Sequence, residues 1–286
     1  MRCDYIMHPI GFRFRAAGGT RLILDVQDNH GGYEGLAQSL LEFLFPAITD
    51  AAYPMQFPDT PFVTQMVQAS IKDLEKTDSF LNHPTLYHWY GYGKNASRPF
   101  RSSDGYFFPT VSLTYNGKTS QYSSLLSPVD RVGYPFGVDS LTPPKGVITP
   151  QFEKNQTMIL SNGACFSECS TFSYLMQEVG VKIVSVGGSL GKPMAFSAGT
   201  ARSPYDLDRL LYFTVQYFNL TEALGAPQPL LVEAHVNYMP AQVLSPQSST
   251  IPADFVFKPA DHRFTFTEAS AESVEALYNQ AAKYFP

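Results

Sequence analysis

The stretch of sequence that decides the fold runs from residue 158 to residue 180 and reads Met-Ile-Leu-Ser-Asn-Gly-Ala-Cys-Phe-Ser-Glu-Cys-Ser-Thr-Phe-Ser-Tyr-Leu-Met-Gln-Glu-Val-Gly. It opens with a short apolar run, Met158–Leu160, followed by the turn formers Ser161–Gly163. Apolar side chains then recur at helical spacing, at Cys169, Phe172, Leu175, Met176 and Val179. Gly180 ends this pattern. The stretch therefore predicts a strand, a tight turn and an amphipathic helix.

Ser167 lies at the start of the expected helix. The first backbone N–H groups of a helix and the positive end of its dipole favour an anion beside this side chain. An oxyanion hole in an enzyme uses the same arrangement. The alternative is that Ser167 is a plain N-cap, because serine is among the commonest capping residues. The local pattern leaves both roles open.

A similar strand, turn and helix pattern lies near the N-terminus. Thr20–Val26 reads as a buried strand, residues 27–32 as a glycine turn, and Tyr33–Phe45 as a helix that ends before Pro46. A phosphate-binding loop is the alternative, but neither of its glycine patterns is present. After the Ser167 helix, the β-branched Val181–Val186 predicts another strand, followed by a second glycine-rich turn. The order of elements predicts an α/β fold.

The rest of the chain gives weaker signals. Residues 50–149 are rich in Pro, Gly, Tyr and Phe, and we expect an irregular insertion within a core of residues 1–49 and 150–286. The aromatic residues of the insertion either pack within it or line a groove; they include Tyr87, Trp89, Tyr90 and Tyr92. Later expected elements are a helix at 205–218, a strand at 230–236, a strand pair within 255–266 and a terminal helix at 271–284.

Composition limits the classes of function. With 286 residues, of which 44% are hydrophobic and 16% charged, the chain can bury one large core or two modest ones. Its net charge of −5, without Lys/Arg clusters, argues against nucleic acid or an anionic membrane as a partner. No run of eighteen apolar residues predicts a membrane span, and the first residues lack the apolar block of a signal peptide. Nothing in the sequence indicates the oligomeric state.

The three cysteines do not form a disulfide framework. Cys165 and Cys169 flank Ser167 without a nearby pair of histidines, so we expect no metal ion and no cofactor. These two cysteines are either small buried residues or one local disulfide. Acceptor patterns for N-glycosylation start at Asn95, Asn155 and Asn219, and they matter only if the protein enters the secretory route.

Several of these segments resemble one known family. Asp25 with Asn29-His30-Gly31-Gly32 is similar to the Asp-x-x-x-Asn-x-Gly-Gly turn of the tail-specific, or C-terminal processing, serine peptidases. The Ser167 turn resembles their nucleophile turn. The branch that looks most similar is the fungal secreted one related to the chlamydial protease-like factor. Its Gly-x-Cys-x-Ser-x-Cys and Pro/Ala-Ala-Asp-x-Arg segments are matched by residues 163–169 and 259–263.

The resemblance implies a layered α/β core of the ClpP/crotonase type and a serine-type endopeptidase that hydrolyses peptide bonds in a protein or peptide substrate through an acyl-enzyme. Ser167 would be the nucleophile. The oxyanion would be held by backbone N–H groups of Gly31 or Gly32 and of Glu168. The family also implies a secreted protein.

A serine hydroxyl needs a general base. Bacterial members of the family use a lysine about 25 residues after the serine, and Lys192 follows Ser167 by 25 residues after a strand and a glycine. As a base, Lys192 needs a pKa lowered from about 10.4 to near 7 or 8, which requires desolvation. The fungal branch instead uses a histidine from a segment before the first strand, where this chain has only residues 1–19.

Other residues are alternatives for the base and its acid partner. The histidines in question are His30, His235 and His262, each of which also fits an ordinary packing or surface role, whereas His8 lies in no matching context. The family often has Glu where this chain has Lys258, and Glu222 and Glu233 are the remaining acid candidates.

Three functions follow from the sequence. The first is a serine endopeptidase, or its C-terminal catalytic portion, with the base supplied by Lys192 or by sequence outside this chain. The second is a catalytically silent relative that binds extended peptide by strand addition. The third is an acyl-CoA enzyme on the same core, for which the chain lacks a basic cluster to hold the CoA phosphates.

Overall fold

The computed structural model describes residues 18–32, 40–48, 53–77, 92–94, 100, 102–128, 152–198, 205–206, 217–220, 237–238, 242–245 and 248–286. The chain forms two compact units. The first unit comprises Met1–Ala51, Ser140–Arg202 and Asp254–Pro286, and the second comprises Ala52–Asp139 and Ser203–Ala253. The segment 203–253, expected in the core, is therefore grouped with the segment expected as an insertion. The predicted domain boundaries stay a prediction.

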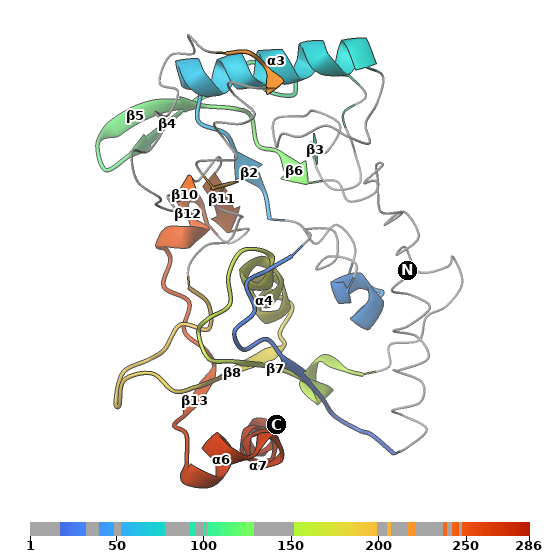
Figure 1. The fold of residues 1–286 in the computed structure, drawn as a ribbon, viewed down its shortest axis with the longest axis vertical. Helices are drawn as coiled ribbons and strands as arrows, with labels where there is room; N and C mark the ends of the chain where they lie inside the picture. The colour runs from blue at the N-terminus through green and yellow to red at the C-terminus, as the bar shows by residue number, and fades with distance from the viewer. Residues whose placement is uncertain are drawn as a thin grey trace. The chain divides into compact units, whose positions relative to one another are not determined.

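A parallel four-stranded sheet forms the centre of the first unit (Figure 1). Its strand order is β1, β7, β8, β13, and every neighbouring pair is parallel. The strands are β1 (Leu22–Asp25), β7 (Thr157–Ser161), β8 (Lys182–Val186) and β13 (His262–Phe264). All five residues of β7 are buried, as expected for a central parallel strand covered on both faces.

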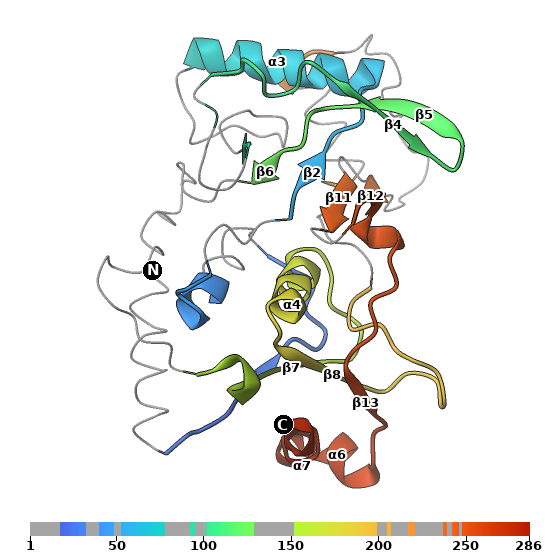
Figure 2. The same cartoon turned by 180° about the vertical axis from the view of Figure 1, so that it is seen from behind.

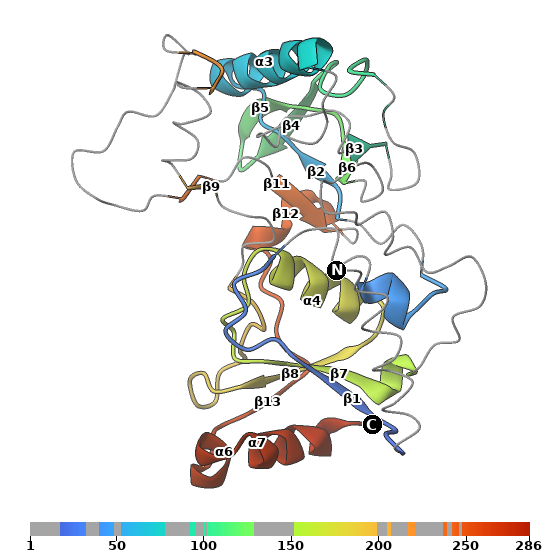
Figure 3. The ribbon, with the colours of Figure 1, turned by 45° about the vertical axis from the view of Figure 1, so that its right-hand side comes forward.

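Helices cover both faces of this sheet (Figure 3). The helix α4 (Glu168–Glu178) connects β7 to β8 on one face. On the other face lie α6 (Glu268–Glu272), α7 (Val274–Ala281) and the 3-10 turn η7 (Ala282–Tyr284). Their apolar side chains join alternate residues of the strands in one core: Met158, Leu160, Val184, Val186, Phe264, Leu277 and Ala281. The alternation follows from the two-residue period of a strand.

The strands predicted at residues 20–26, 158–160 and 181–186 are confirmed as β1, β7 and β8. The helix predicted after Ser167 is confirmed as α4. Of the helix expected at 33–45, residues 40–44 are helical and 33–39 lie outside the described residues. The terminal helix expected at 271–284 is confirmed over α7 and continues as η7, but residues 271–272 belong to α6. Ser273 separates the two helices, because its side chain accepts a hydrogen bond from Ala276 N and caps α7. The expected strand pair is one strand, β13, and Phe255 lies in the 3-10 turn η6 (Ala253–Phe255).

Among the described residues of the second unit are a long helix and several short strands (Figure 2). The helix α3 (Pro61–Thr77) places Phe62, Val63, Met66 and Val67 in a core with Tyr92 and Leu126. The other elements are β2 (Met55–Gln56), β3 (Tyr92–Gly93), β4 (Val111–Tyr115), β5 (Lys118–Tyr122), β6 (Ser127–Pro128), β9 (Tyr205–Asp206), β10 (Asn237–Tyr238), β11 (Gln242–Ser245) and β12 (Ser248–Pro252).

Residues 50–149 were expected to be irregular. This prediction was wrong for the helix and strands that the structure describes between those residues. Proline at the first helical position suits α3, and Asn116-Gly117, both at positive φ, form the two-residue turn that suits the β4–β5 hairpin. Tyr205–Asp206 is strand β9 rather than the start of a helix, and its partner is β10. The expected strand at 230–236 lies outside the described residues. So do Tyr87, Trp89 and Tyr90, whereas Tyr92 packs in the core.

Candidate active site

The turns expected to carry the chemistry follow neighbouring strands of the parallel sheet. Residues 27–32 follow β1, residues 162–167 follow β7, and residues 187–192 follow β8. Because the strands are parallel, their carboxyl ends meet at one edge of the sheet, where open α/β sheets commonly bind their ligands. Parallel pairing thus brings the turn after β1 to the same edge as two turns that follow it by more than 100 residues.

Ser167 is the last residue before α4 and has an unusual backbone conformation, with φ 52° and ψ −124°. Such a conformation costs a non-glycine residue about 1–3 kcal/mol and persists only where its surroundings impose it. The Ser167 side chain makes no capping hydrogen bond, although the residue occupies the N-cap position. The plain-cap alternative was therefore wrong. A sharp strand-to-helix turn with a strained serine is the geometry of a nucleophile elbow.

The Asn162 side chain ties the turn after β7 to the turn after β1. Its Nδ2 donates to Asp28 Oδ1 at 2.9 Å, and its Oδ1 accepts from Asp28 N at 3.3 Å. The same oxygen accepts from Ala164 N at 3.0 Å. The backbone adds a bond from Phe166 N to Asn29 O at 3.0 Å. This role of Asn162 was not predicted from the sequence, in which the residue is only a turn former.

Gly31 lies against Ser167 so closely that no other residue fits its position. A Cβ on Gly31 would lie 2.7 Å from Ser167 Cβ and 2.9 Å from Phe166 O. Its φ of +101° also favours glycine. The same Cβ would lie 3.1 Å from Glu168 N, so the glycine turn faces the start of α4. The structure brings Gly31, Ser167 and Glu168 together, and their roles as nucleophile and oxyanion hole stay a prediction.

The backbone N–H groups near Ser167 differ in what they contact. Gly31 N donates to Asn29 Oδ1 at 2.8 Å. Glu168 is the first residue of α4, where the helix itself supplies no acceptor for the N–H group. A Cβ added to Gly32 would meet no atom within 4 Å, so space is open beside that residue.

Cys165 and Cys169 form a disulfide across the Ser167 turn, with a Cα–Cα distance of 5.4 Å. The disulfide alternative from the sequence is confirmed. Both cysteines are also buried, with exposed fractions of 0% and 6%. Cys165 lies within the turn after β7 and Cys169 in the first turn of α4, so the bond encloses Ser167.

Lys192 is exposed at the end of the turn after β8. Its backbone is anchored, because its N–H donates to Ser189 O at 3.2 Å and its carbonyl accepts from Arg263 Nη1 at 3.0 Å. Arg263 Nε also donates to Gly187 O, so one guanidinium holds both ends of the turn. The desolvation that a lysine base requires is not present at Lys192 in this conformation.

The described histidines pack against aromatic rings. His30 stacks on Phe166, with ring centroids 5.5 Å apart and an interplanar angle of 7°. His262 stacks on Tyr284 at 5.2 Å, on the side of the sheet that α7 and η7 cover. His8, His235, Glu222 and Glu233 lie outside the described residues.

Lys258 forms a largely buried ion pair with Glu178 at the end of α4, with Nζ and Oε1 3.2 Å apart.

A chain of buried hydroxyl groups at α4 was not predicted from the sequence. Ser170 Oγ donates to Ser197 Oγ at 2.9 Å, and Ser197 Oγ donates to Tyr174 OH at 3.2 Å. All three side chains are buried. The run of hydroxyl residues in the first turns of α4 was the available signal.

The acceptor asparagines Asn155 and Asn219 are exposed, and Asn95 lies outside the described residues. Within the part of the chain that the structure describes, no group of His, Cys, Asp or Glu side chains has the arrangement of a metal site. No helix among the described residues has the length and apolar character needed to cross a membrane.

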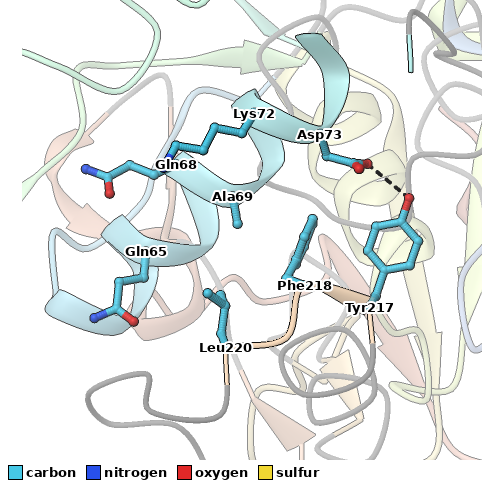
Figure 4. A pocket seen from close by; sticks show the side chains of 8 residues that line it. All are labelled: Gln65, Gln68, Ala69, Lys72, Asp73, Tyr217, Phe218 and Leu220. Carbon is cyan, nitrogen blue, oxygen red and sulfur yellow. Dashed lines mark hydrogen bonds between the residues drawn. The ribbon is translucent and has the colours of Figure 1, made fainter. Parts of the chain in front are cut away.

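A separate pocket of about 340 Å³ lies in the second unit, between α3 and residues 217–220 (Figure 4). Its lining residues are Gln65, Gln68, Ala69, Lys72, Asp73, Tyr217, Phe218 and Leu220. Tyr217 OH donates to Asp73 Oδ2 at 3.0 Å across one end of it. The pocket contains none of the residues singled out from the sequence for catalysis.

Comparison with known proteins finds a distant relative. No family model matches the chain, and no solved structure matches it. The chain is 25% identical over 244 residues to "Peptidase S41 family protein ustP" of Aspergillus flavus, an alignment that covers 77% of this chain and 47% of the relative. The chain thus spans about half the length of that protein. This distant similarity supports a relationship to the S41 serine peptidases, in agreement at the family level with the resemblance found in the sequence.

Proposed function

We propose that this chain is the catalytic portion of a serine-type endopeptidase, with Ser167 as the nucleophile. The observation that carries the proposal is the strained backbone conformation of Ser167 at the start of α4, where its side chain makes no capping hydrogen bond and packs against Gly31. The similarity to an S41 peptidase supports it independently. The assignment to the fungal secreted branch is part of the proposal. A disulfide beside the nucleophile suits the oxidising compartments of the secretory route.

In the proposed reaction, Ser167 Oγ attacks the carbonyl carbon of a peptide bond while a base accepts the hydroxyl proton. The oxygen of the tetrahedral intermediate accepts hydrogen bonds from Glu168 N and from Gly32 N or Gly31 N. Gly31 N serves only if it exchanges its present acceptor, Asn29 Oδ1. The amine leaves with a proton, an acyl-enzyme remains on Ser167, and water hydrolyses it.

The base is Lys192 or a group from outside this chain. Arg263 fixes the backbone of the turn that carries Lys192, but the Lys192 side chain is exposed. A base role for Lys192 therefore requires that bound substrate, or polypeptide outside this chain, shields its side chain from water.

Labelling with a fluorophosphonate probe tests the nucleophile. We expect labelling at Ser167, located by peptide mass spectrometry, and its loss in Ser167→Ala. Ser112→Ala, which removes an exposed hairpin serine, is the matched control and keeps the label. Loss of labelling in Lys192→Ala identifies the base within this chain, whereas unchanged labelling assigns the base to another group. A folded wild-type protein that stays unlabelled contradicts the proposal.

The exposure of Lys192 favours a second candidate, a catalytically silent peptide-binding relative. In that case an extended peptide is added as a strand beside β1, the outer strand of the described sheet, and no base activates Ser167. Peptide binding measured by fluorescence anisotropy, without cleavage after prolonged incubation and without probe labelling, is the result expected for this candidate.

A further inference from the structure

The nucleophile turn is closed by a covalent bond as well as by hydrogen bonds. Cys165 and Cys169 are two residues before and two residues after Ser167, and their disulfide makes a five-residue ring around it. We propose that this disulfide is a positioning element that holds Ser167 in its reactive conformation. The inference rests on the proposed function, because it assigns a role in the same reaction.

Each end of the disulfide is attached to a rigid element. On the strand side, Cys165 O accepts from Ala198 N at 3.1 Å, and Cys165 pairs with Asn29 as an isolated parallel bridge. On the helix side, Cys169 N donates to Phe166 O at 3.1 Å in the first turn of α4. The bond therefore fixes the spacing between the turn after β7 and the helix that follows it.

The conformation of Ser167 needs such a constraint. A φ of 52° is unfavourable for serine, and the residue is followed directly by a helix. Phe166 N bonds to Asn29 O before Ser167, Gly31 packs beside it, and Ser167 O accepts from Thr171 N at 3.1 Å within α4. The disulfide adds a covalent link between the two sides of Ser167. Without the disulfide, Ser167 can relax to the ordinary helical conformation and extend α4 by one residue. That relaxation moves Oγ away from Glu168 N and the glycine turn.

Breaking the bond requires an external reductant such as a dithiol. Two electrons and two protons from the dithiol convert the disulfide into the thiols of Cys165 and Cys169, and the dithiol leaves as a cyclic disulfide. Cys165 is fully buried and Cys169 is 6% exposed, so attack by an external thiolate is slow in the folded protein. The oxidised turn is accordingly stable under mildly reducing conditions.

The rate of fluorophosphonate labelling at Ser167 tests the inference, with the disulfide removed in Cys165→Ala/Cys169→Ala. We expect the maximal inactivation rate constant to fall on the order of 100-fold, because a displacement of about 1 Å has that effect on a reacting group. The inhibition constant of the probe stays near its wild-type value. Cys3→Ser, which removes the third cysteine, is the control and leaves both constants unchanged.

Circular dichroism and thermal unfolding show whether the double variant is folded. If it does not fold, wild-type protein reduced with dithiothreitol after folding gives the second measurement: its thiol count rises by two, its labelling slows, and reoxidation restores the rate.

A folded variant, or reduced folded wild type, that labels at the oxidised wild-type rate overturns the positioning role and leaves the proposed function intact. Oxidised wild-type protein that does not label at all contradicts the proposed function itself.

Discussion

At the scale of single residues, the site depends on contacts that only certain side chains permit. Ser167 has a conformation that serine rarely adopts, and Gly31 is the neighbour whose missing side chain leaves room for it. Asn162 bridges the two turns through both ends of its amide. Ser167 was predictable from its place between an apolar run and a helix. The fit of Gly31 against it was not, because that contact joins residues far apart in the sequence.

Gly31→Ala should lower the free energy of unfolding by about 3 kcal/mol, since the new Cβ meets two atoms at under 3 Å and φ is positive. Gly180→Ala is the matched variant, because Gly180 has a similar φ of +96° but open space around it. It should cost about 1 kcal/mol. Urea unfolding of both variants measures the difference. Equal losses would show that the packing of Gly31 against Ser167 contributes nothing.

At the scale of elements, hydrophobic pattern predicted the parallel strands well, because buried strands of such a sheet are short continuous apolar runs. It failed for α3 and the β4–β5 hairpin, although the helix carries apolar residues at helical spacing and the hairpin carries Asn-Gly. The frequent Pro, Gly and aromatic residues around both elements favoured irregular structure, and this composition outweighed the local patterns in the prediction. The break between α6 and α7 was missed because it depends on one capping serine.

Asp261 links β13 to β8 at the edge of the sheet, through Lys182 Nζ at 2.7 Å and Ile183 N at 2.9 Å. Burial alone would raise the pKa of the Asp261 carboxyl, but hydrogen bonds from Lys182 and Ile183 N and the charge of Lys182 together lower it below its ordinary value of 3.8. The ionised carboxylate therefore stabilises the fold fully above that value. This stabilisation is lost as the pH falls through the lowered pKa.

Asp261→Asn should cost about 1 kcal/mol at pH 7, because Lys182 is half exposed and solvent screens the pair. The variant should also lose less stability than wild type when the pH falls from 5 to 3. Thermal unfolding across this range measures both effects, with Glu272→Gln as the exposed control. A melting temperature of Asp261→Asn that falls as steeply with acid as that of wild type argues against the linkage.

At the scale of the whole molecule, the chain divides into two units that each have a core of their own. The parallel sheet core includes Leu277, and the α3 core includes Met66. Composition allowed either one large core or two modest ones, and the described residues form a separate core in each unit. The candidate site belongs entirely to the first unit.

Leu277→Ala and Met66→Ala should each destabilise by about 2–5 kcal/mol, because both side chains are buried in apolar surroundings. The effects should be confined to different elements. Hydrogen exchange should rise in β7, β8 and β13 in the first variant, and in α3 in the second. Uniform increases across both units in either variant would indicate one cooperative core instead.

The sequence by itself determined the parallel strands around Ser167, the helix after it and the place of Ser167 at their junction, because these features follow from the local spacing of apolar and turn-forming residues. Tertiary structure decided which turns meet Ser167, that Cys165 and Cys169 are bonded, and that Lys192 is exposed. These outcomes depend on burial and on contacts between residues distant in the chain, such as Asp28 and Asn162. No local pattern contains that information.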